Sequence, residues 1–263
     1  MTGVCCGTYE ADNRDRSMYV HLLHLGRVSY AEGLAIQKRV VDARKQGLIG
    51  DTLLLLEHPP VLTLGRNSSR SNVLASDEFL AARGVELHEI NRGGDVTYHG
   101  PGQLVGYPIV DLRGDLPGKK GPHLGPVDFV RMLEEVLIRV CNDFGVMAQR
   151  IPKRTGVWTI AGGSIEEKKI AAIGVHVSQG VTSHGFALNV TTDLRDFDWI
   201  VPCGITDRTV TSLELEADPG RQPTMEDALN STARNFGRVF ERQMLWCESV
   251  DELLSPSLNT AGA

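Results

Sequence analysis

Hydrophobic residues along this chain recur at two spacings, one typical of strands and the other of helices. Short apolar or alternating runs predict strands near residues 19–25, 53–56, 61–64, 85–90, 95–98, 104–110, 157–160, 169–177 and 181–190. Apolar residues three and four positions apart predict helices at 29–44, 76–82, 127–144 and 225–244. Strands outnumber helices and do not alternate regularly with them. We therefore predict an α+β fold with a mixed or antiparallel sheet.

The remaining stretches predict loops and tails around one folded unit. Residues 112–126 contain four glycines and three prolines, which is typical of a loop. Residues 1–17 and 249–263 lack regular patterning, so we expect flexible tails there. The intervening residues, 18–248, are enough for a single domain with a substantial core.

Composition and charge exclude several classes of protein. A net charge of −6 argues against general nucleic-acid binding, which requires a basic face. No apolar run is long enough to cross a membrane, and the polar N-terminus lacks the apolar core of a signal peptide. The five cysteines have irregular spacing and include no Cys-x-x-Cys pair. We therefore expect reduced thiols, a cytoplasmic location and no structural metal site.

The most informative segment is rich in glycine and lies among predicted strands. It reads Arg-Gly-Gly-Asp-Val-Thr-Tyr-His-Gly-Pro-Gly-Gln and covers residues 92–103. Glycines within strand-forming sequence allow a ligand or another backbone to approach closely. Arg92 and His99 add polar groups on either side. The segment is therefore predicted to form the wall of a binding site.

A cysteine with open surroundings is a candidate nucleophile. Cys203 lies between Pro202 and Gly204, which favour a defined turn and leave the thiol accessible. A thiolate attacks thioesters and amides well, but it needs a nearby base or cation. Cys141 differs, because it falls in the apolar stripe of a predicted helix and is expected to be a buried small hydrophobe.

The cation could come from the doublet Lys168-Lys169, which begins an apolar strand. Because side chains alternate along a strand, one of the two lysines is expected to face the buried side of the sheet. The alternative is that both lysines are solvated at a hairpin.

A third segment, residues 183–190, places small residues on one side of an apolar strand. Gly185 and Ala187 would leave room for a chain-like ligand. His184 is either a base or a hydrogen-bonded structural residue, and Asn189 could tie neighbouring loops together.

Four segments in order resemble the motifs of lipoyl(octanoyl) transferases, also called lipoate-protein ligase B. They are the glycine-rich segment at 92–103, Lys-Ile-Ala-Ala-Ile-Gly at 169–174, Ser-His-Gly-Phe-Ala-Leu-Asn-Val at 183–190 and Pro-Cys-Gly-Ile at 202–205. Four long motifs in order are far more specific than a single glycine pattern, and the resemblance covers essentially the whole domain. It implies the fold of the biotin/lipoate protein ligase superfamily, with a mixed, mainly antiparallel sheet flanked by helices.

The resemblance also implies the reaction, which begins endogenous protein lipoylation without a cofactor. The enzyme would move an octanoyl group from acyl carrier protein to a lysine of lipoyl domains, in 2-oxoacid dehydrogenase complexes and in glycine cleavage H protein. Cys203 would attack the thioester and carry the octanoyl group, while Lys169, next to the Ile-Ala-Ala-Ile-Gly run, would activate the thiol and relay protons. The implied acyl-binding residues are Arg92, Gly93, Gly94, Asp95, Val96, Thr97, Tyr98, His99, Ala172, Ile173, Gly174, Gly185, Phe186 and Ala187.

Three other functions compete with this interpretation. An ATP-dependent lipoate or biotin ligase of the same superfamily would activate a free acid and need no cysteine. A Cys-His thioester hydrolase would use Cys203 with His184 or His99 and release free octanoate. A carrier-binding module would have an unreactive Cys203. Because carrier proteins and lipoyl domains are acidic, we also expect a local basic rim, with these candidates: Arg66, Arg70, Arg150, Lys153 and Arg154.

Overall fold

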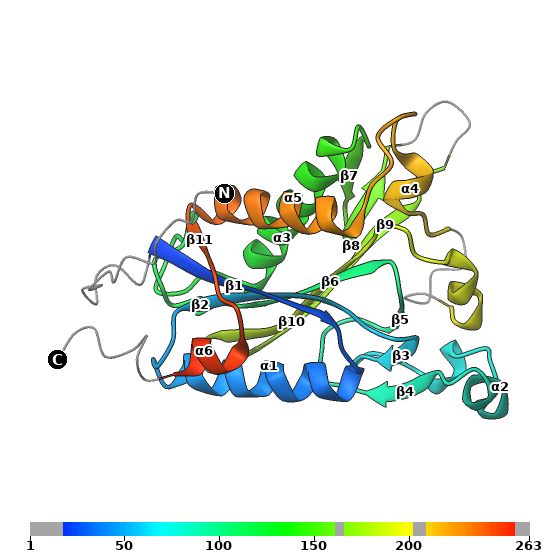
Figure 1. Ribbon diagram of the computed structural model, residues 1–263, viewed down its shortest axis with the longest axis horizontal. Helices are drawn as coiled ribbons and strands as arrows, with labels where there is room; N and C mark the ends of the chain where they lie inside the picture. The colour runs from blue at the N-terminus through cyan, green and yellow to red at the C-terminus, as the bar shows by residue number, and fades with distance from the viewer. Residues whose placement is uncertain (1–17, 161–165, 202–208, 256–263) are drawn as a thin grey trace, which may run out of the picture.

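The computed structural model describes residues 18–160, 166–201 and 209–255, which form two sheets flanked by helices (Figure 1). In spatial order, the eight strands of the large sheet are β11 (Gln243–Trp246), β1 (Tyr19–Arg27), β2 (Asp51–Glu57), β6 (Gln103–Ile109), β10 (Val181–Asn189), β9 (Lys169–Ser178), β8 (Arg154–Thr159) and β7 (Ala148–Ile151). Strand β1 pairs in parallel with β11 and β2, and every other neighbouring pair in this sheet is antiparallel. The predicted α+β class with a mixed, mainly antiparallel sheet is confirmed.

Helices cover both faces of the large sheet. Helices α3 (Pro126–Asp143) and α5 (Met225–Phe240) lie together on one face, and α1 (Tyr30–Lys45) and α6 (Val250–Leu254) lie on the other (Figure 1). The stripe of α3 that faces the sheet is fully buried, and it includes Cys141, as predicted. Burial raises the pKa of the Cys141 thiol to about 12, so this cysteine is an inert core residue.

The small sheet extends beyond one end of the large sheet. Its strands lie in the order β4 (Glu86–Glu89), β3 (Val61–Leu64) and β5 (Val96–His99), and helix α2 (Asp77–Ala82) packs beside them (Figure 1). Glycine-rich residues 92–95 link β4 to β5 and also contact the large sheet, where the Gly93 amide donates to the Val175 carbonyl at 3.1 Å. The wall segment predicted from the sequence therefore connects the two sheets.

The last long helix is shorter than its apolar spacing predicts. Helix α5 ends at Phe240 because Glu241 adopts a left-handed conformation, with φ of 53°. The following residues then form β11, which pairs with β1, rather than a further helical turn. The predicted helix end at residue 244 is wrong, since pairing with the edge of the sheet outweighs local helix preference.

The predicted C-terminal tail is also partly wrong. Residues 250–254 form helix α6, whose N-terminus is capped by the Ser249 hydroxyl accepting from the Glu252 amide at 3.1 Å. Leu253 is buried against the α1 side of the sheet. The folded unit therefore extends past residue 248, while residues 1–17 and 256–263 lie outside the described part of the chain.

Candidate active site

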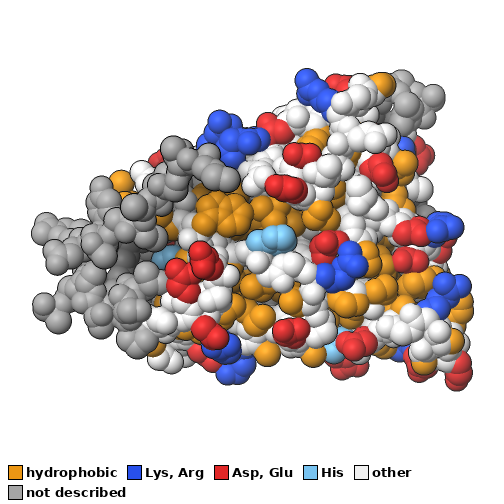
Figure 2. Space-filling model, in the orientation of Figure 1, with side chains coloured by type: hydrophobic (Ala, Val, Ile, Leu, Met, Phe, Trp, Pro, Cys, Tyr) orange, Lys and Arg blue, Asp and Glu red, His pale blue; other side chains and the backbone are white. Residues whose placement is uncertain are grey.

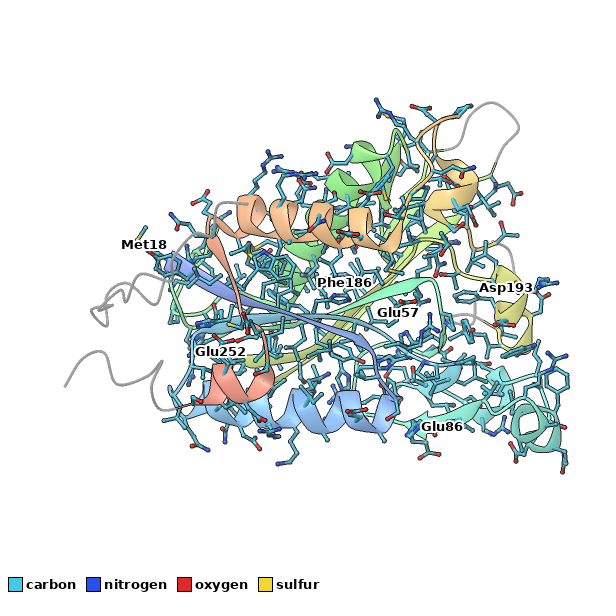
Figure 3. All side chains as sticks on the ribbon, viewed as in Figure 1. Met18, Glu57, Glu86, Phe186, Asp193 and Glu252 are labelled. Atoms are coloured by element: carbon cyan, nitrogen blue, oxygen red, sulfur yellow. The ribbon has the colours of Figure 1, made fainter. Side chains whose placement is uncertain are left out.

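The sequence-predicted walls meet around one pocket between the two sheets. The β9 and β10 strands form one side, and the glycine-rich segment with β5 forms the other. Phe186 lines the pocket and lies near the centre of the molecule (Figure 3), and its ring fills the space that a side chain at Gly106 would occupy. Of the site residues predicted from the sequence, the following line this pocket: Arg92, Gly94, Asp95, Val96, Thr97, His99, Lys169, Ala172, Ile173, Gly174, His184, Gly185, Phe186 and Ala187.

Two glycines of this pocket allow close backbone packing. Gly174 pairs with Gly185 across β9 and β10. A Cβ atom at Gly174 would lie 2.6 Å from the Gly93 carbonyl oxygen, and one at Gly185 would lie 2.1 Å from the Gly106 carbonyl oxygen. Gly185 therefore makes room for strand β6 rather than directly for a ligand, which differs from the reason predicted from its sequence.

The position of Arg92 fixes the glycine-rich wall to the small sheet. The side chain is buried, and its Nη2 donates to the carbonyl and the hydroxyl of Thr63, each at 2.9 Å. Its Nη1 donates to the Gly93 carbonyl at 3.1 Å. Arg92 thus holds the wall in place while bringing a positive charge to the edge of the pocket.

The two predicted histidines are hydrogen-bonded to amide oxygens rather than to carboxylates. His99 Nδ1 lies 2.7 Å from Gln103 Oε1, and His184 Nε2 lies 2.8 Å from Asn91 Oδ1. Burial lowers the pKa of His99 to about 3 and that of His184 to about 4. Both rings are therefore neutral near pH 7, and the hydrogen bond from His184 to Asn91 is consistent with its interpretation as a structural residue.

Sequence reasoning missed an aromatic cluster at the end of the pocket where Tyr30, Tyr107 and His184 lie. The Tyr107 hydroxyl lies 2.8 Å from His58 Nε2, and His58 Nδ1 lies 2.9 Å from the Val28 carbonyl. The Tyr30 ring stacks on His99 with 6.1 Å between centroids. Tyr30, Val105 and Tyr107 all line the pocket. The available signal was three polar aromatic residues within or beside buried apolar runs.

The side chains of Lys168 and Lys169 point in different directions, as expected from the alternation of side chains along a strand. The Lys168 ammonium pairs with the Glu216 carboxylate at 3.0 Å, whereas Lys169 lines the pocket. Lys169 also lines a smaller adjoining hollow that includes Gln103, Asn189 and Val210. Lys169 therefore lies where the two spaces meet, and solvation of both lysines at a hairpin is excluded.

Backbone hydrogen bonds bring both flanks of the cysteine motif close to the pocket. The Val201 amide donates to the Asn72 carbonyl at 2.8 Å, and Asn72 in turn donates from Nδ2 to Asp95 Oδ2 at 2.7 Å. On the other side, Val210 pairs with Lys169 itself. Cys203 lies outside the described residues, between these two anchored positions.

Three other predicted residues occupy different places from the pocket wall. The Tyr98 hydroxyl donates to Asp196 Oδ2 at 2.6 Å, and its ring belongs to the core beneath the small sheet. The Gly93 backbone joins β9, as described above. The Asn189 Nδ2 donates to the Thr211 carbonyl at 2.9 Å while Asn189 Oδ1 accepts from Gln103, so the prediction that Asn189 ties loops together is confirmed.

Two of the arginines predicted for the basic rim form ion pairs with acidic side chains. Arg70 pairs with Asp77, and Arg150 pairs with Glu135 at 2.8 Å. Acidic and basic side chains are interspersed over the visible face (Figure 2). This face therefore offers no large patch of one sign.

The described residues contain neither a metal-binding cluster nor a membrane-spanning helix. Across residues 18–160, 166–201 and 209–255, no group of three or more His, Cys, Asp or Glu side chains is placed to hold a metal ion. Over the same ranges, no helix has the length and apolar character needed to span a membrane.

Comparison with known proteins gives consistent results. The family model of the lipoyl protein ligase A/B catalytic domain matches residues 29–237. The octanoyltransferase of Acidobacterium capsulatum is 68% identical over 243 residues, which cover 92% of this chain and 98% of that protein. The octanoyltransferase of Koribacter versatilis is 54% identical over 235 residues, covering 89% of this chain and 90% of that protein.

Solved structures share the fold at low sequence identity. Lipoate-protein ligase A bound with ATP has a TM-score of 0.70 at 15% identity, over 93% of this chain and 94% of that one. A putative lipoate protein ligase from T. acidophilum with bound lipoic acid has a TM-score of 0.69 at 17% identity, over 92% and 94% of the two chains. These similarities place the chain in the fold of the biotin/lipoate protein ligases.

Proposed function

Since the chain belongs to the lipoyl protein ligase A/B catalytic-domain family and is an octanoyltransferase, we propose that it works by a two-step, cysteine-linked transfer. The donor is octanoyl-acyl carrier protein, and the acceptor is a lysine of a lipoyl domain, in 2-oxoacid dehydrogenase complexes and in glycine cleavage H protein. Cys203 carries the octanoyl group between them, and Lys169 moves the protons.

One observation supports this assignment above the others. Lys169 lies where the pocket meets a second hollow, and it pairs through its backbone with Val210, seven positions after Cys203. The other flank, Val201, is hydrogen-bonded beside the glycine-rich wall. Cys203 falls between these two positions in the sequence, which supports assigning the thiol and the Lys169 amine to one site.

In the first step, the Cys203 thiol transfers its proton to the neutral Lys169 amine. The resulting thiolate attacks the carbonyl carbon of the donor thioester, and a new carbon–sulfur bond forms. The tetrahedral intermediate collapses by breaking the bond to the carrier's sulfur, which takes the proton from Lys169. The products are octanoyl-Cys203 and the free thiol of the carrier.

In the second step, the neutral ε-amine of the acceptor lysine attacks the octanoyl-Cys203 carbonyl. Lys169 removes a proton from the attacking nitrogen and then returns it to the departing Cys203 sulfur. The net change converts a thioester and an amine into an amide and a thiol. No bond is made that requires ATP, because the thioester is already activated.

The pocket walls supply the selectivity for the acyl group. Ala172, Ile173, Phe186 and Ala187 present carbon atoms to the pocket. Each methylene buried there contributes about 0.8 kcal/mol to binding. The aromatic cluster that contains Tyr30 and Tyr107 limits how far the octanoyl chain extends into the pocket.

A reconstituted assay tests the proposal. The purified protein is incubated with octanoyl-acyl carrier protein and a lipoyl domain, without ATP, and the lipoyl domain is weighed by intact mass spectrometry. We expect a gain of about 126 Da on the lipoyl domain. Modification that occurs only with free octanoate and ATP would instead identify a ligase. Release of free octanoate without modification would identify a hydrolase.

A further inference from the structure

Strand β8 presents an indole ring to the side chain of Lys169. Trp158 pairs directly with Lys169 across β8 and β9. The Lys169 Nζ lies 5.3 Å from the centroid of the Trp158 ring, and Trp158 is only 1% exposed. A cation at this distance from a desolvated indole is attracted by the electron-rich face of the ring.

A glycine two residues earlier makes room for the stem of the same lysine. Gly156 has φ of 119°, a conformation that other residues rarely adopt. A Cβ atom at Gly156 would lie 2.8 Å from Lys169 Cε and 2.6 Å from the Ala171 carbonyl oxygen. Only glycine therefore fits at position 156 while the Lys169 side chain keeps its present conformation.

Helix α3 holds this part of β8 in place. The buried Glu134 carboxylate accepts a hydrogen bond from the Gly156 amide at 3.1 Å, and it also pairs with Arg131 at 2.6 Å. The backbone next to the lysine stem is thus fixed from inside the core rather than by solvent-exposed contacts.

The backbone of Lys169 is fixed as firmly as its side chain. Its amide donates to the Thr209 carbonyl at 3.0 Å, and its carbonyl accepts from the Thr211 amide at 2.9 Å. The neighbouring Lys168 turns away to Glu216. Lys169 is therefore held from three directions, by its backbone, by the space at Gly156 and by the Trp158 face.

We propose that Trp158 and Gly156 form a seat for the Lys169 amine, with Trp158 as a positioning residue of the transfer reaction. The expected effect on the transfer rate rests on the proposed function, whereas the seat itself consists of contacts among the described residues. Trp158 Nε1 is buried and has no hydrogen-bond partner among the described residues, which is unusual for an indole. The described contacts of the side chain instead involve the ring face, which lies 5.3 Å from Lys169 Nζ and, more distantly, 6.0 Å from the guanidinium carbon of Arg154.

The kinetic test compares two substitutions with different ring content. Trp158→Phe keeps an aromatic face and Trp158→Leu removes it. Rates are measured with octanoyl-acyl carrier protein and a lipoyl domain, after thermal unfolding has established that each variant is folded. We expect kcat to fall about tenfold in Trp158→Leu, with the donor KM within about twofold, and most of the rate to return in Trp158→Phe. Trp246→Leu, at an exposed tryptophan on β11, is the matched control and keeps the parent rate.

A second readout does not depend on transfer activity. Amine modification with formaldehyde and a borohydride reagent is followed by peptide mass mapping. We expect Lys169 to be labelled several-fold faster in Trp158→Leu than in the parent, while Lys168 on the same peptide is unchanged.

The outcomes separate the seat from the function. Equal kcat in the parent and in Trp158→Leu, or equal loss in the Leu and Phe variants, would overturn the positioning role. An unchanged Lys169 labelling rate would also overturn it. A parent protein that transfers no octanoyl group, combined with the expected labelling change, would refute the proposed function and leave the seat standing.

Discussion

Acidification should destabilise this protein through three buried neutral histidines, His58, His99 and His184. Their side chains are at most 7% exposed, and burial is the main reason that their pKa values fall to about 4, 3 and 4, respectively. In the unfolded chain a histidine takes up a proton near pH 6.5. Between pH 6.5 and pH 5 the unfolded state therefore binds more protons than the folded state, so stability is lost as the pH falls.

The size of the effect follows from the proton difference. For each additional proton bound by the unfolded state, the free energy of unfolding falls by about 1.4 kcal/mol per unit decrease in pH. Each histidine therefore lowers the free energy of unfolding by about 2 kcal/mol between pH 6.5 and pH 5. The three together lower the free energy of unfolding by up to about 6 kcal/mol, which is a large part of the roughly 5–15 kcal/mol typical of a folded domain.

Urea unfolding at pH 7 and pH 5, followed by circular dichroism, measures this difference. His58→Gln should reduce the pH-dependent loss by about 2 kcal/mol, because glutamine takes up no proton. Substitution of the exposed His24 or His123 by glutamine should leave the loss unchanged. Comparing variants cancels the contribution of carboxyl groups such as Asp51, whose pKa is raised by burial. If His58→Gln and the parent lost the same stability, the buried neutral state of His58 would be refuted.

Three further predictions follow from the pocket and the core. Ala172→Leu extends a side chain into the pocket and should lower kcat/KM for octanoyl donors at least about tenfold while sparing four-carbon donors, and an unchanged ratio would contradict the pocket assignment. Glu134→Gln should lower the free energy of unfolding, measured in urea, by about 2–4 kcal/mol, because the buried carboxylate binds Arg131 and the Gly156 amide. A loss under about 0.5 kcal/mol would show that these contacts contribute little. Iodoacetamide at pH 7 should leave Cys141 unmodified in the native protein, since burial raises its pKa to about 12, and peptide mapping that found it alkylated would contradict its burial.

Much of the fold was predictable because most elements depend on local patterning. The long amphipathic helix α3 and strands such as β9 and β10 lie where apolar spacing places them. Two of the exceptions depend on distant partners. Residues 243–246 become a strand only because β1 offers its edge, and helix α6 forms where Leu253 reaches the core beside α1. Neither partner is visible in the local pattern.

The site was predictable to the extent that glycine positions mark close backbone approach. The glycine-rich wall and the β9–β10 motifs do converge, and Lys169 does turn toward the pocket. Sequence patterning misplaced Tyr98, which lies on the opposite side of β5 and bonds to Asp196. It also missed Tyr30 and His58, because hydrogen bonds and ring stacking between separate elements bring these side chains together.

The most direct test of the cysteine-linked mechanism is the mass of the enzyme itself after reaction with the donor alone. The protein is incubated with octanoyl-acyl carrier protein, without an acceptor, and its intact mass is measured. We predict a gain of about 126 Da that is absent in Cys203→Ala and disappears when a lipoyl domain is added. Transfer to the lipoyl domain without any such adduct would mean direct attack by the acceptor lysine, and it would contradict the proposed role of Cys203.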